Sequence, residues 1–325
     1  MKVLSINKRN AKRLREQLPQ DIEVITPDVG DDAELIKLAG DVEVILATRL
    51  SPEVALAAKK LKLLQKTGAG VDDMPFDVLG EDVWVANTSG SNPVPLAEGA
   101  VSMVLALAKR IVPRHMTFRS GRSGPSGVLL QGKKAGIIGL GSIGVEVAQR
   151  LKCFGMEVLA VKRHRDDKLK EELGLTFLGT EKVLHYVLSE SDFVVVTVPL
   201  TPETRGLIGE EEIAVMKTTS YIVNVARAAI IDEEPLYVAL KEGRIAGAGI
   251  DVWWKPHWWD PLWNKDGGDA SQYPYWELSN VICTPHNIGS SDTASDAGLE
   301  IMKENILRIR DGKQPINQVD KKLRY

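Results

Sequence analysis

Short runs of apolar and β-branched residues alternate with segments of helical periodicity along almost the whole chain. This alternation is typical of α/β proteins, in which helices cover a parallel sheet. An apolar helix predicted over residues 96–111 joins two groups of strands, and a last helix over residues 293–310 follows them. The predicted strands are residues 3–6, 22–25, 44–47, 63–66 and 83–86 in the first group, and 134–138, 157–161, 193–197, 221–224, 247–250 and 281–283 in the second.

The composition is compatible with two globular domains. The 325 residues are 44% hydrophobic and carry a formal net charge of -3, so nucleic acid and anionic membranes are not predicted partners, and a small diffusible substrate fits better. Two cysteines, Cys153 and Cys283, are too few for a disulfide framework or a structural zinc site; we expect both to be buried, and we predict no metal. No apolar signal region opens the sequence, and no apolar run reaches the roughly 18 residues of a membrane span. We therefore expect a cytoplasmic protein.

A glycine turn, Gly139-Leu140-Gly141-Ser142-Ile143-Gly144, lies between a short apolar strand and an amphipathic helix over residues 145–154. In this context Gly139 permits a tight turn, Gly141 allows the backbone to approach a pyrophosphate, and Gly144 allows close helix–strand packing. The amides of the helix N-terminus, including those of Ser142 and Ile143, are suited to bind phosphate. The turn predicts a nicotinamide dinucleotide site; the alternative is a glycine turn without a ligand.

A basic run follows the next predicted strand, where dinucleotide-binding folds contact the adenosine ribose. Eighteen residues after Gly144 the sequence reads Lys162-Arg163-His164-Arg165, and no carboxylate appears before Asp166. Lysine and arginine here favour a 2′-phosphate, so NADP(H) is the preferred cofactor and NAD(H) remains possible. The alternative is a solvated basic loop with no role in cofactor selection.

Eight segments, in the same order, are similar to the D-isomer-specific 2-hydroxyacid dehydrogenase family. Besides the glycine turn they are Gly68-Ala69-Gly70-Val71-Asp72, Asn87-Thr88-Ser89-Gly90, Ala97-Glu98, Val198-Pro199-Leu200-Thr201-Pro202-Glu203-Thr204, Asn224-Val225-Ala226-Arg227, Gly247-Ala248-Gly249-Ile250-Asp251-Val252 and Thr284-Pro285-His286. The resemblance implies a Rossmann-type doubly wound parallel sheet, residues 97–289, inserted into a flavodoxin-like α/β substrate domain, residues 1–96 plus 290–325. It also implies a homodimer formed partly by the long helix and the loop before Gly136.

The resemblance also implies the roles of individual residues. Arg227 would clamp the carboxylate and carbonyl oxygen of a 2-oxo acid, and His286 would donate the proton that the developing alkoxide needs. The substrate carboxylate would meet Ala69, Gly70 and Asn92. The remaining residues implied to bind the cofactor are Val198, Pro199, Val225, Ala226, Asp251 and Gly289.

One position departs from the family pattern. A glutamate usually stands five residues after the aspartate equivalent to Asp251 and pairs with the catalytic histidine, but here Pro256 occupies that place. Three explanations are open. Another carboxylate of the same loop (Asp260, Asp266, Asp269 or Glu277) pairs with His286, His286 works unpaired, or the reaction needs no strong proton donor, as in formate oxidation.

Six of the seven tryptophans lie between residues 253 and 276. They form either a small core beneath the loop, or an apolar wall over the cleft or a dimer contact.

The leading hypothesis is an NADP(H)-preferring reductase of small 2-oxo acids, of the glyoxylate/hydroxypyruvate type. A formate- or phosphite-type dehydrogenase of the same superfamily is a second hypothesis. A non-enzymatic, dinucleotide-sensing protein similar to the family's corepressors is the third, and the presence of Arg227 and His286 argues against it.

Overall fold

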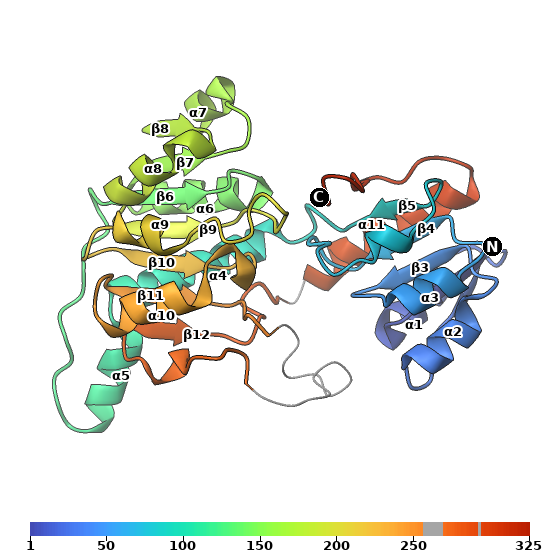
Figure 1. Ribbon diagram of the computed structural model, residues 1–325, viewed down its shortest axis with the longest axis horizontal. Helices are drawn as coiled ribbons and strands as arrows, with labels where there is room; N and C mark the ends of the chain where they lie inside the picture. Colours follow the sequence, from blue (N-terminus) through green and yellow to red (C-terminus); the bar gives the residue numbers. More distant parts are fainter. Residues whose placement is uncertain (256–268, 292–293) are drawn as a thin grey trace. The chain divides into compact units, whose positions relative to one another are not determined.

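The computed structural model describes residues 1–255, 269–291 and 294–325 (Figure 1). The chain divides into two compact units, an outer unit of Met1–Asn92 and Ser291–Tyr325 and an inserted unit of Pro93–Ser290. The sequence predicts domain boundaries after residues 96 and 289. Substrate binding by the outer unit and cofactor binding by the inserted unit remain predictions.

The outer unit contains a parallel sheet in the order β2-β1-β3-β4-β5. This order is that of a flavodoxin-like doubly wound sheet and confirms the predicted fold class. The strands are β1 (Lys2–Ser5), β2 (Glu23–Ile25), β3 (Val44–Ala47), β4 (Leu63–Lys66) and β5 (Trp84–Ala86).

Helices cover both faces of this sheet, because neighbouring strand residues point to opposite sides. Val3 packs in the core cluster that contains residues of α1 and α11, whereas Leu4 packs with residues of α2 and α3. These elements are α1 (Lys8–Gln17), α2 (Asp32–Ala39), α3 (Pro52–Ala57) and α11 (Ala294–Arg310), with a 3-10 turn η1 (Phe76–Val78).

The inserted unit contains a parallel sheet in the order β12-β11-β10-β9-β6-β7-β8. The chain starts at β6, runs outward to β8, and then crosses to β9 on the other side of β6, which is the reversal that defines a Rossmann sheet. Its strands are β6 (Lys134–Ile138), β7 (Glu157–Val161), β8 (Phe177–Gly179), β9 (Phe193–Val196), β10 (Tyr221–Asn224), β11 (Gly247–Ile250) and β12 (Val281–Cys283). Every strand of the second predicted group is present, and β8 was not predicted.

Two apolar clusters lie on either face of this sheet. Ile137 packs with residues of α4, α6 and α7, and Ile138 packs with residues of α8, α9 and α10. The helices of the unit are α4 (Pro93–Ala108), α5 (Ile111–Arg119), α6 (Ser142–Cys153), α7 (Asp167–Leu173), α8 (Leu184–Glu190), α9 (Glu210–Ala214) and α10 (Glu233–Lys241), with 3-10 turns η2 (Glu181–Val183), η3 (Ala228–Ile230) and η4 (Tyr275–Glu277).

Two local predictions for this unit are wrong. The single helix predicted over residues 96–111 ends at Ala108, and α5 starts at Ile111 after Arg110 has turned into the left-handed region with φ 53°. Pro113 explains the break, because in a continuous helix its ring would clash with the carbonyl of Lys109. The predicted burial of both cysteines also fails: Cys153, the last residue of α6, is exposed, and Cys283 is half-buried.

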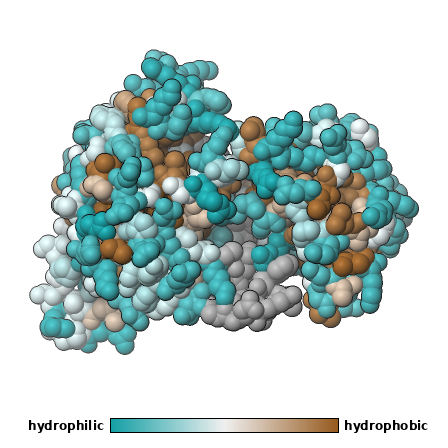
Figure 2. All heavy atoms as spheres, in the orientation of Figure 1, coloured by the Kyte–Doolittle hydropathy of each residue, from teal (hydrophilic) through white to brown (hydrophobic). Residues whose placement is uncertain are grey.

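Hydrophilic residues cover most of the face that each unit presents in Figure 2. Across the described parts of the chain, no helix has both the length and the apolar character needed to cross a membrane.

Candidate active site

The strands of the inserted sheet end in register, which places six loops in one row. Ile138 pairs with Val161 and Val196, and the pairing continues through Asn224 and Ile250. Adjacent strands lie about 4.8 Å apart, so the row extends for roughly 24 Å along the carboxyl edge of the sheet. In spatial order the residues that follow the paired positions are Thr284, Asp251, Val225, Thr197, Gly139 and Lys162.

The glycine turn after β6 has the backbone that the sequence predicts. Gly139 has φ 104°, and a Cβ there would lie 2.7 Å from the amide nitrogen of Val198 in the loop after β9. The hydroxyl of Thr197 donates a hydrogen bond of 2.6 Å to the carbonyl oxygen of Gly139. A Cβ on Gly144 would overlap that same carbonyl oxygen, so this glycine is required for close packing between α6 and the turn.

Gly141, in contrast, faces open space: a Cβ there would meet no atom within 4 Å. It forms the N-cap of α6, with φ -88° and no side chain to cap the first amides of the helix. Amides in the first turn of a helix lack intrahelical acceptors, and the helix dipole adds positive potential there. Ser142 is exposed while Ile143 packs against the core, so the turn fits a pyrophosphate group.

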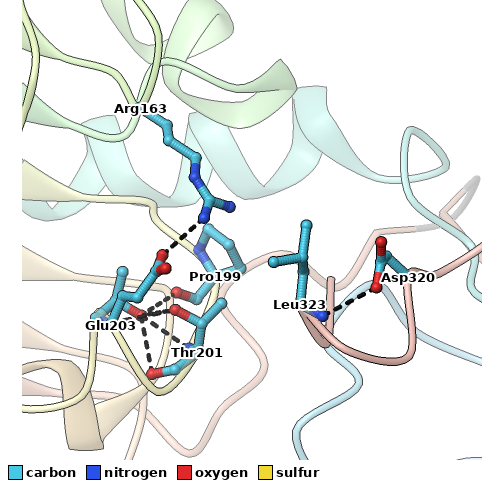
Figure 3. Close-up of polar contacts among 7 residues, drawn as sticks. Arg163, Pro199, Thr201, Glu203, Asp320 and Leu323 are labelled. Atoms are coloured by element: carbon cyan, nitrogen blue, oxygen red, sulfur yellow. Dashed lines mark hydrogen bonds and ion pairs between the residues drawn. The ribbon is translucent and has the colours of Figure 1, made fainter.

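The predicted basic run follows β7, and its cations have acidic partners. Lys162 Nζ lies 3.0 Å from Asp166 Oδ2, and Arg165 Nε lies 2.8 Å from Asp167 Oδ1. Asp166 is also the N-cap of α7; the Leu169 amide and then Lys162 hold the pKa of its carboxyl below the usual value. Arg163 Nη2 lies 2.8 Å from Glu203 Oε2 in the loop after β9 (Figure 3).

Arg227 follows β10 in a turn that a buried amide organises. The side chain of Asn224 donates a hydrogen bond of 3.0 Å to the carbonyl of Arg227 and accepts one of 3.1 Å from the amide of Ala226. Arg227 is half-buried, and its Nη1 donates to the carbonyl of Ala226 at 2.9 Å. Among the predicted cofactor-binding residues of these loops, Val225 is 4% exposed in the core, Val198 and Ala226 are half-buried, and Pro199 is exposed.

Asp251, at the end of β11, ties down the loop that carries His286. One carboxylate oxygen accepts hydrogen bonds from the Thr284 hydroxyl (2.6 Å) and from the amides of Asn287 (3.0 Å) and Ile288 (3.2 Å). Asp251 is 1% exposed; burial raises the pKa of its carboxyl, while these hydrogen bonds act in the opposite direction. The loop is thus anchored on both sides of His286.

His286 itself is exposed and has φ 56°, a left-handed conformation that is uncommon for residues other than glycine. Such backbone costs about 1–3 kcal/mol and persists where the surroundings determine it fully. Trp253 adds a further anchor, because its indole N–H donates a hydrogen bond of 2.9 Å to the carbonyl of Thr284. Gly289 is buried in the same loop.

Sequence reasoning missed the residues that organise these loops: Thr197, Asn224, Thr284 and Trp253. All but Trp253 lie at or next to the carboxyl ends of predicted strands, where a buried polar side chain needs a hydrogen-bond partner. That position is the signal that would have found them.

A cavity of about 280 Å³ lies beside this loop; its described lining includes Trp253, Asp269, Trp276, Thr284 and Pro285. Of the carboxylates proposed to replace the missing glutamate, Asp269 therefore lies near the His286 loop, and Glu277 is exposed on η4. Pro256, Asp260 and Asp266 lie outside the described residues. Cys283 also lines the cavity, and burial raises the pKa of its thiol to about 12, which keeps the thiol protonated.

The tryptophan cluster contributes to the core where it is described. Trp254 stacks on Tyr275 with ring centroids 5.2 Å apart, Trp253 meets the same ring edge-on at 6.4 Å, and both belong to the apolar cluster beneath the loop. Both residues therefore pack in the main core on one face of the inserted sheet, rather than in the separate small core that the sequence predicts. Trp276 is 47% exposed, and the other tryptophans of the segment lie outside the described residues.

The predicted substrate-binding residues belong to the outer unit. Ala69 and Gly70 follow β4, and the side chain of Asn87 donates a hydrogen bond of 2.8 Å to the carbonyl of Ala69. Beneath this loop Lys66, only 4% exposed, forms an ion pair with Asp73 at 2.5 Å. Asn92 is half-buried at the end of the unit's first segment.

Comparison with known proteins identifies the family. A family model described as D-isomer specific 2-hydroxyacid dehydrogenase, NAD binding domain, matches residues 101–287. The chain belongs to this family. It is 32% identical to a glyoxylate reductase of Korarchaeum cryptofilum over 317 residues, covering 95% of this chain and 89% of that protein, and 35% identical to one of Thermococcus gammatolerans over 304 residues, covering 89% and 86%.

Among solved structures, a Thermus thermophilus protein matches with a TM-score of 0.79 at 30% identity, covering 98% of this chain and all of that one. The protein is accordingly an oxidoreductase with an NAD(P)-binding Rossmann domain, acting on 2-hydroxy acids and their 2-oxo partners. This assignment replaces the non-enzymatic alternative.

Proposed function

We propose that the protein is an NADP(H)-linked reductase of small 2-oxo acids, of the glyoxylate/hydroxypyruvate type. The observation that carries the proposal is the row of loops on the inserted sheet. Along one edge it orders the basic run, the glycine turn, Arg227 and the His286 loop. Bound NADP(H) and its substrate need these groups in this order: cations for the 2′-phosphate at the adenosine end, amides for the pyrophosphate, and an anion-binding group and a proton donor for the 2-oxo acid.

In this proposal the glycine turn and the N-terminus of α6 hold the pyrophosphate, and Arg163 with Lys162 meets the 2′-phosphate. The cofactor, when bound, supplies the hydride. The guanidinium of Arg227 binds the 2-oxo acid by its carboxylate and carbonyl oxygen, and it stabilises the negative charge that develops on that oxygen. His286 donates the proton that completes the hydroxyl group. Ala69, Gly70 and Asn92 of the outer unit remain the proposed substrate-binding residues.

The proton donor requires a stable position, and the contacts around His286 support one. Asp251 and Trp253 fix the loop through four hydrogen bonds of 2.6–3.2 Å. Among the candidate carboxylates that the structure describes, Asp269 shares a cavity with Thr284 and Pro285, so we propose it, beside Asp260, as the partner of His286. The pH–rate profile of 2-oxo acid reduction tests both. Asp269→Asn or Asp260→Asn should move the alkaline limb, where His286 loses the proton that it donates, only if the replaced carboxylate interacts with His286.

The proposal includes a homodimer. Every residue of α5 is at least partly exposed, and its apolar side chains include Phe118 at 81% exposure and Met116 at 57%. Leu129, in the loop before β6, is 65% exposed. Large apolar side chains with this exposure on one short helix support a protein interface.

The test is cofactor consumption by the purified protein with glyoxylate, hydroxypyruvate, pyruvate and phenylpyruvate, using NADPH and NADH in parallel. Formate and phosphite are tested for reduction of NADP⁺ and NAD⁺. The proposal predicts activity with glyoxylate and hydroxypyruvate and a lower KM for NADPH than for NADH. It also predicts that Arg227→Gln and His286→Gln lower kcat by at least about a hundredfold. Turnover of formate or phosphite alone would favour the second hypothesis.

A further inference from the structure

The ion pair between Arg163 and Glu203 connects the two loops on either side of the glycine turn. Arg163 follows β7 and Glu203 follows β9, and in the sheet these strands are the two neighbours of β6. A contact between their loops therefore passes over the carboxyl end of β6, where the glycine turn begins. The loop after β9 also touches the turn directly, since Val198 lies against Gly139.

The loop that carries Glu203 is held by its own hydrogen bonds. The Thr204 hydroxyl donates a hydrogen bond of 2.6 Å to the carbonyl of Pro199 and accepts one of 2.8 Å from the amide of Thr201. The Thr201 hydroxyl in turn accepts from the amide of Thr204 at 3.3 Å. Because these bonds fix the residues on both sides of Glu203, its carboxylate is presented to Arg163 by a formed turn.

Arg163 differs in this respect from its basic neighbours. Lys162 and Arg165 pair with Asp166 and Asp167, which lie within four residues of them at the start of α7. Arg163 reaches a carboxylate 40 positions away in the sequence. The pair is partly open to solvent, with side-chain exposures of 39% for Arg163 and 67% for Glu203, so exchange of one anion for another on the guanidinium costs little.

We propose that Glu203 determines cofactor selectivity by competing with the 2′-phosphate of NADP(H) for the guanidinium of Arg163. The proposal rests on the dinucleotide site proposed above. With NADP(H), the phosphate takes the place of the carboxylate on Arg163, so cofactor binding must break the Arg163–Glu203 pair. With NAD(H), the Arg163–Glu203 pair persists, and Glu203 supplies the ribose acceptor that is missing from the end of β7.

The experiment measures dissociation constants of NADPH and NADH by isothermal titration calorimetry, with no substrate present. Glu203→Gln should tighten NADPH binding by about fivefold, the scale of one exposed ion pair, and leave NADH binding unchanged or weaker. Arg163→Gln should weaken NADPH binding by about tenfold, and in that background Glu203→Gln should change it by less than about twofold. The effect of Glu203→Gln should shrink as salt is added.

Asp167→Asn is the matched control, because it removes one negative charge from the neighbouring Arg165 pair and leaves Arg163–Glu203 intact. Thermal unfolding of each variant without cofactor checks that the fold is kept. The proposal is overturned if Glu203→Gln leaves the ratio of the two dissociation constants unchanged, or if Asp167→Asn changes it equally. A wild type that prefers NADH refutes the proposed NADP(H) preference alone, because the shift caused by Glu203→Gln is measured against that wild type. Failure of the wild type to bind either cofactor refutes both.

Discussion

Replacing Gly141 and Gly144 by alanine, one at a time, separates cofactor binding from packing within the same turn. The two residues are three positions apart, yet a Cβ at Gly141 meets no atom within 4 Å whereas a Cβ at Gly144 overlaps the carbonyl oxygen of Gly139. Gly141 also has φ -88°, which alanine adopts without strain. We therefore expect Gly141→Ala to impair binding and Gly144→Ala to impair stability.

The magnitudes follow from these surroundings. Alanine is a poorer N-cap than Gly141, which lowers the free energy of unfolding by about 0.5–1 kcal/mol. Alanine also reduces the conformational entropy of the unfolded chain, which raises the free energy of unfolding by about 0.4–1 kcal/mol. The two effects nearly cancel. The new methyl group takes the space proposed for the pyrophosphate; losing one charged hydrogen bond of about 1.5–3 kcal/mol corresponds to a roughly 10- to 100-fold higher Kd. At Gly144, overpacking costs about 1–3 kcal/mol, a decrease in Tm of roughly 2–12 °C.

The assay pairs thermal unfolding without cofactor with calorimetric titration of NADPH. Gly141→Ala should melt with the wild type and bind NADPH weakly, and Gly144→Ala should melt early. If Gly141→Ala bound NADPH as tightly as the wild type, the pyrophosphate would not lie at Gly141. If this variant unfolded at a lower temperature than the wild type, the space around Gly141 would not be open in the folded protein.

Three further predictions concern the loop, the outer unit and the dimer. Trp253→Phe removes the donor to the Thr284 carbonyl, so it should lower the free energy of unfolding by about 1 kcal/mol and lower kcat without changing the KM for the cofactor. Thermal unfolding and steady-state kinetics measure these changes, and a wild-type kcat in this variant would contradict the prediction. The amides of residues 28–30 hold the pKa of Glu34 below its usual 4.5, so the stability that this carboxylate contributes is complete above pH 4.5 and is lost as pH falls through the lowered pKa. Glu34→Gln should therefore lower Tm at neutral pH, and the difference in Tm from the wild type should vanish on acidification; a difference that does not depend on pH would contradict this. Phe118→Asp should convert a dimer to a monomer in light scattering, and a wild type that is already monomeric would exclude the interface.

The fold was predictable from local pattern because strands and helices are encoded by periodicities of a few residues. The strands of the inserted sheet that carry the proposed site fall where the apolar runs predict them. The strand β8, Phe177–Gly179, was missed because it contains no β-branched residue and ends in a glycine. The break at Arg110 lies just inside the predicted end of the helix at residue 111, and its local signal, Pro113, stands two residues beyond that end.

The candidate site was predictable as residue types and less so as contacts. Arg227 and His286 were found through family motifs, which fix identity and order along the chain. The anchoring of His286 by Asp251 and Trp253, and the pairing of Arg163 with Glu203, join residues 31 to 40 positions apart. Such contacts depend on strand order and register, which a single sequence does not encode locally.

Isotope transfer tests the proposed hydride transfer from NADPH to the carbonyl carbon of a small 2-oxo acid. The protein is incubated with hydroxypyruvate and NADPH that carries deuterium at both C4 positions of the nicotinamide ring, and the product is examined by mass spectrometry and chiral chromatography. We expect a D-2-hydroxy acid that carries one deuterium at C2, and we expect this product to be lost in Arg227→Gln and His286→Gln. No reduced product, a product without deuterium, or wild-type yield from both variants would contradict it.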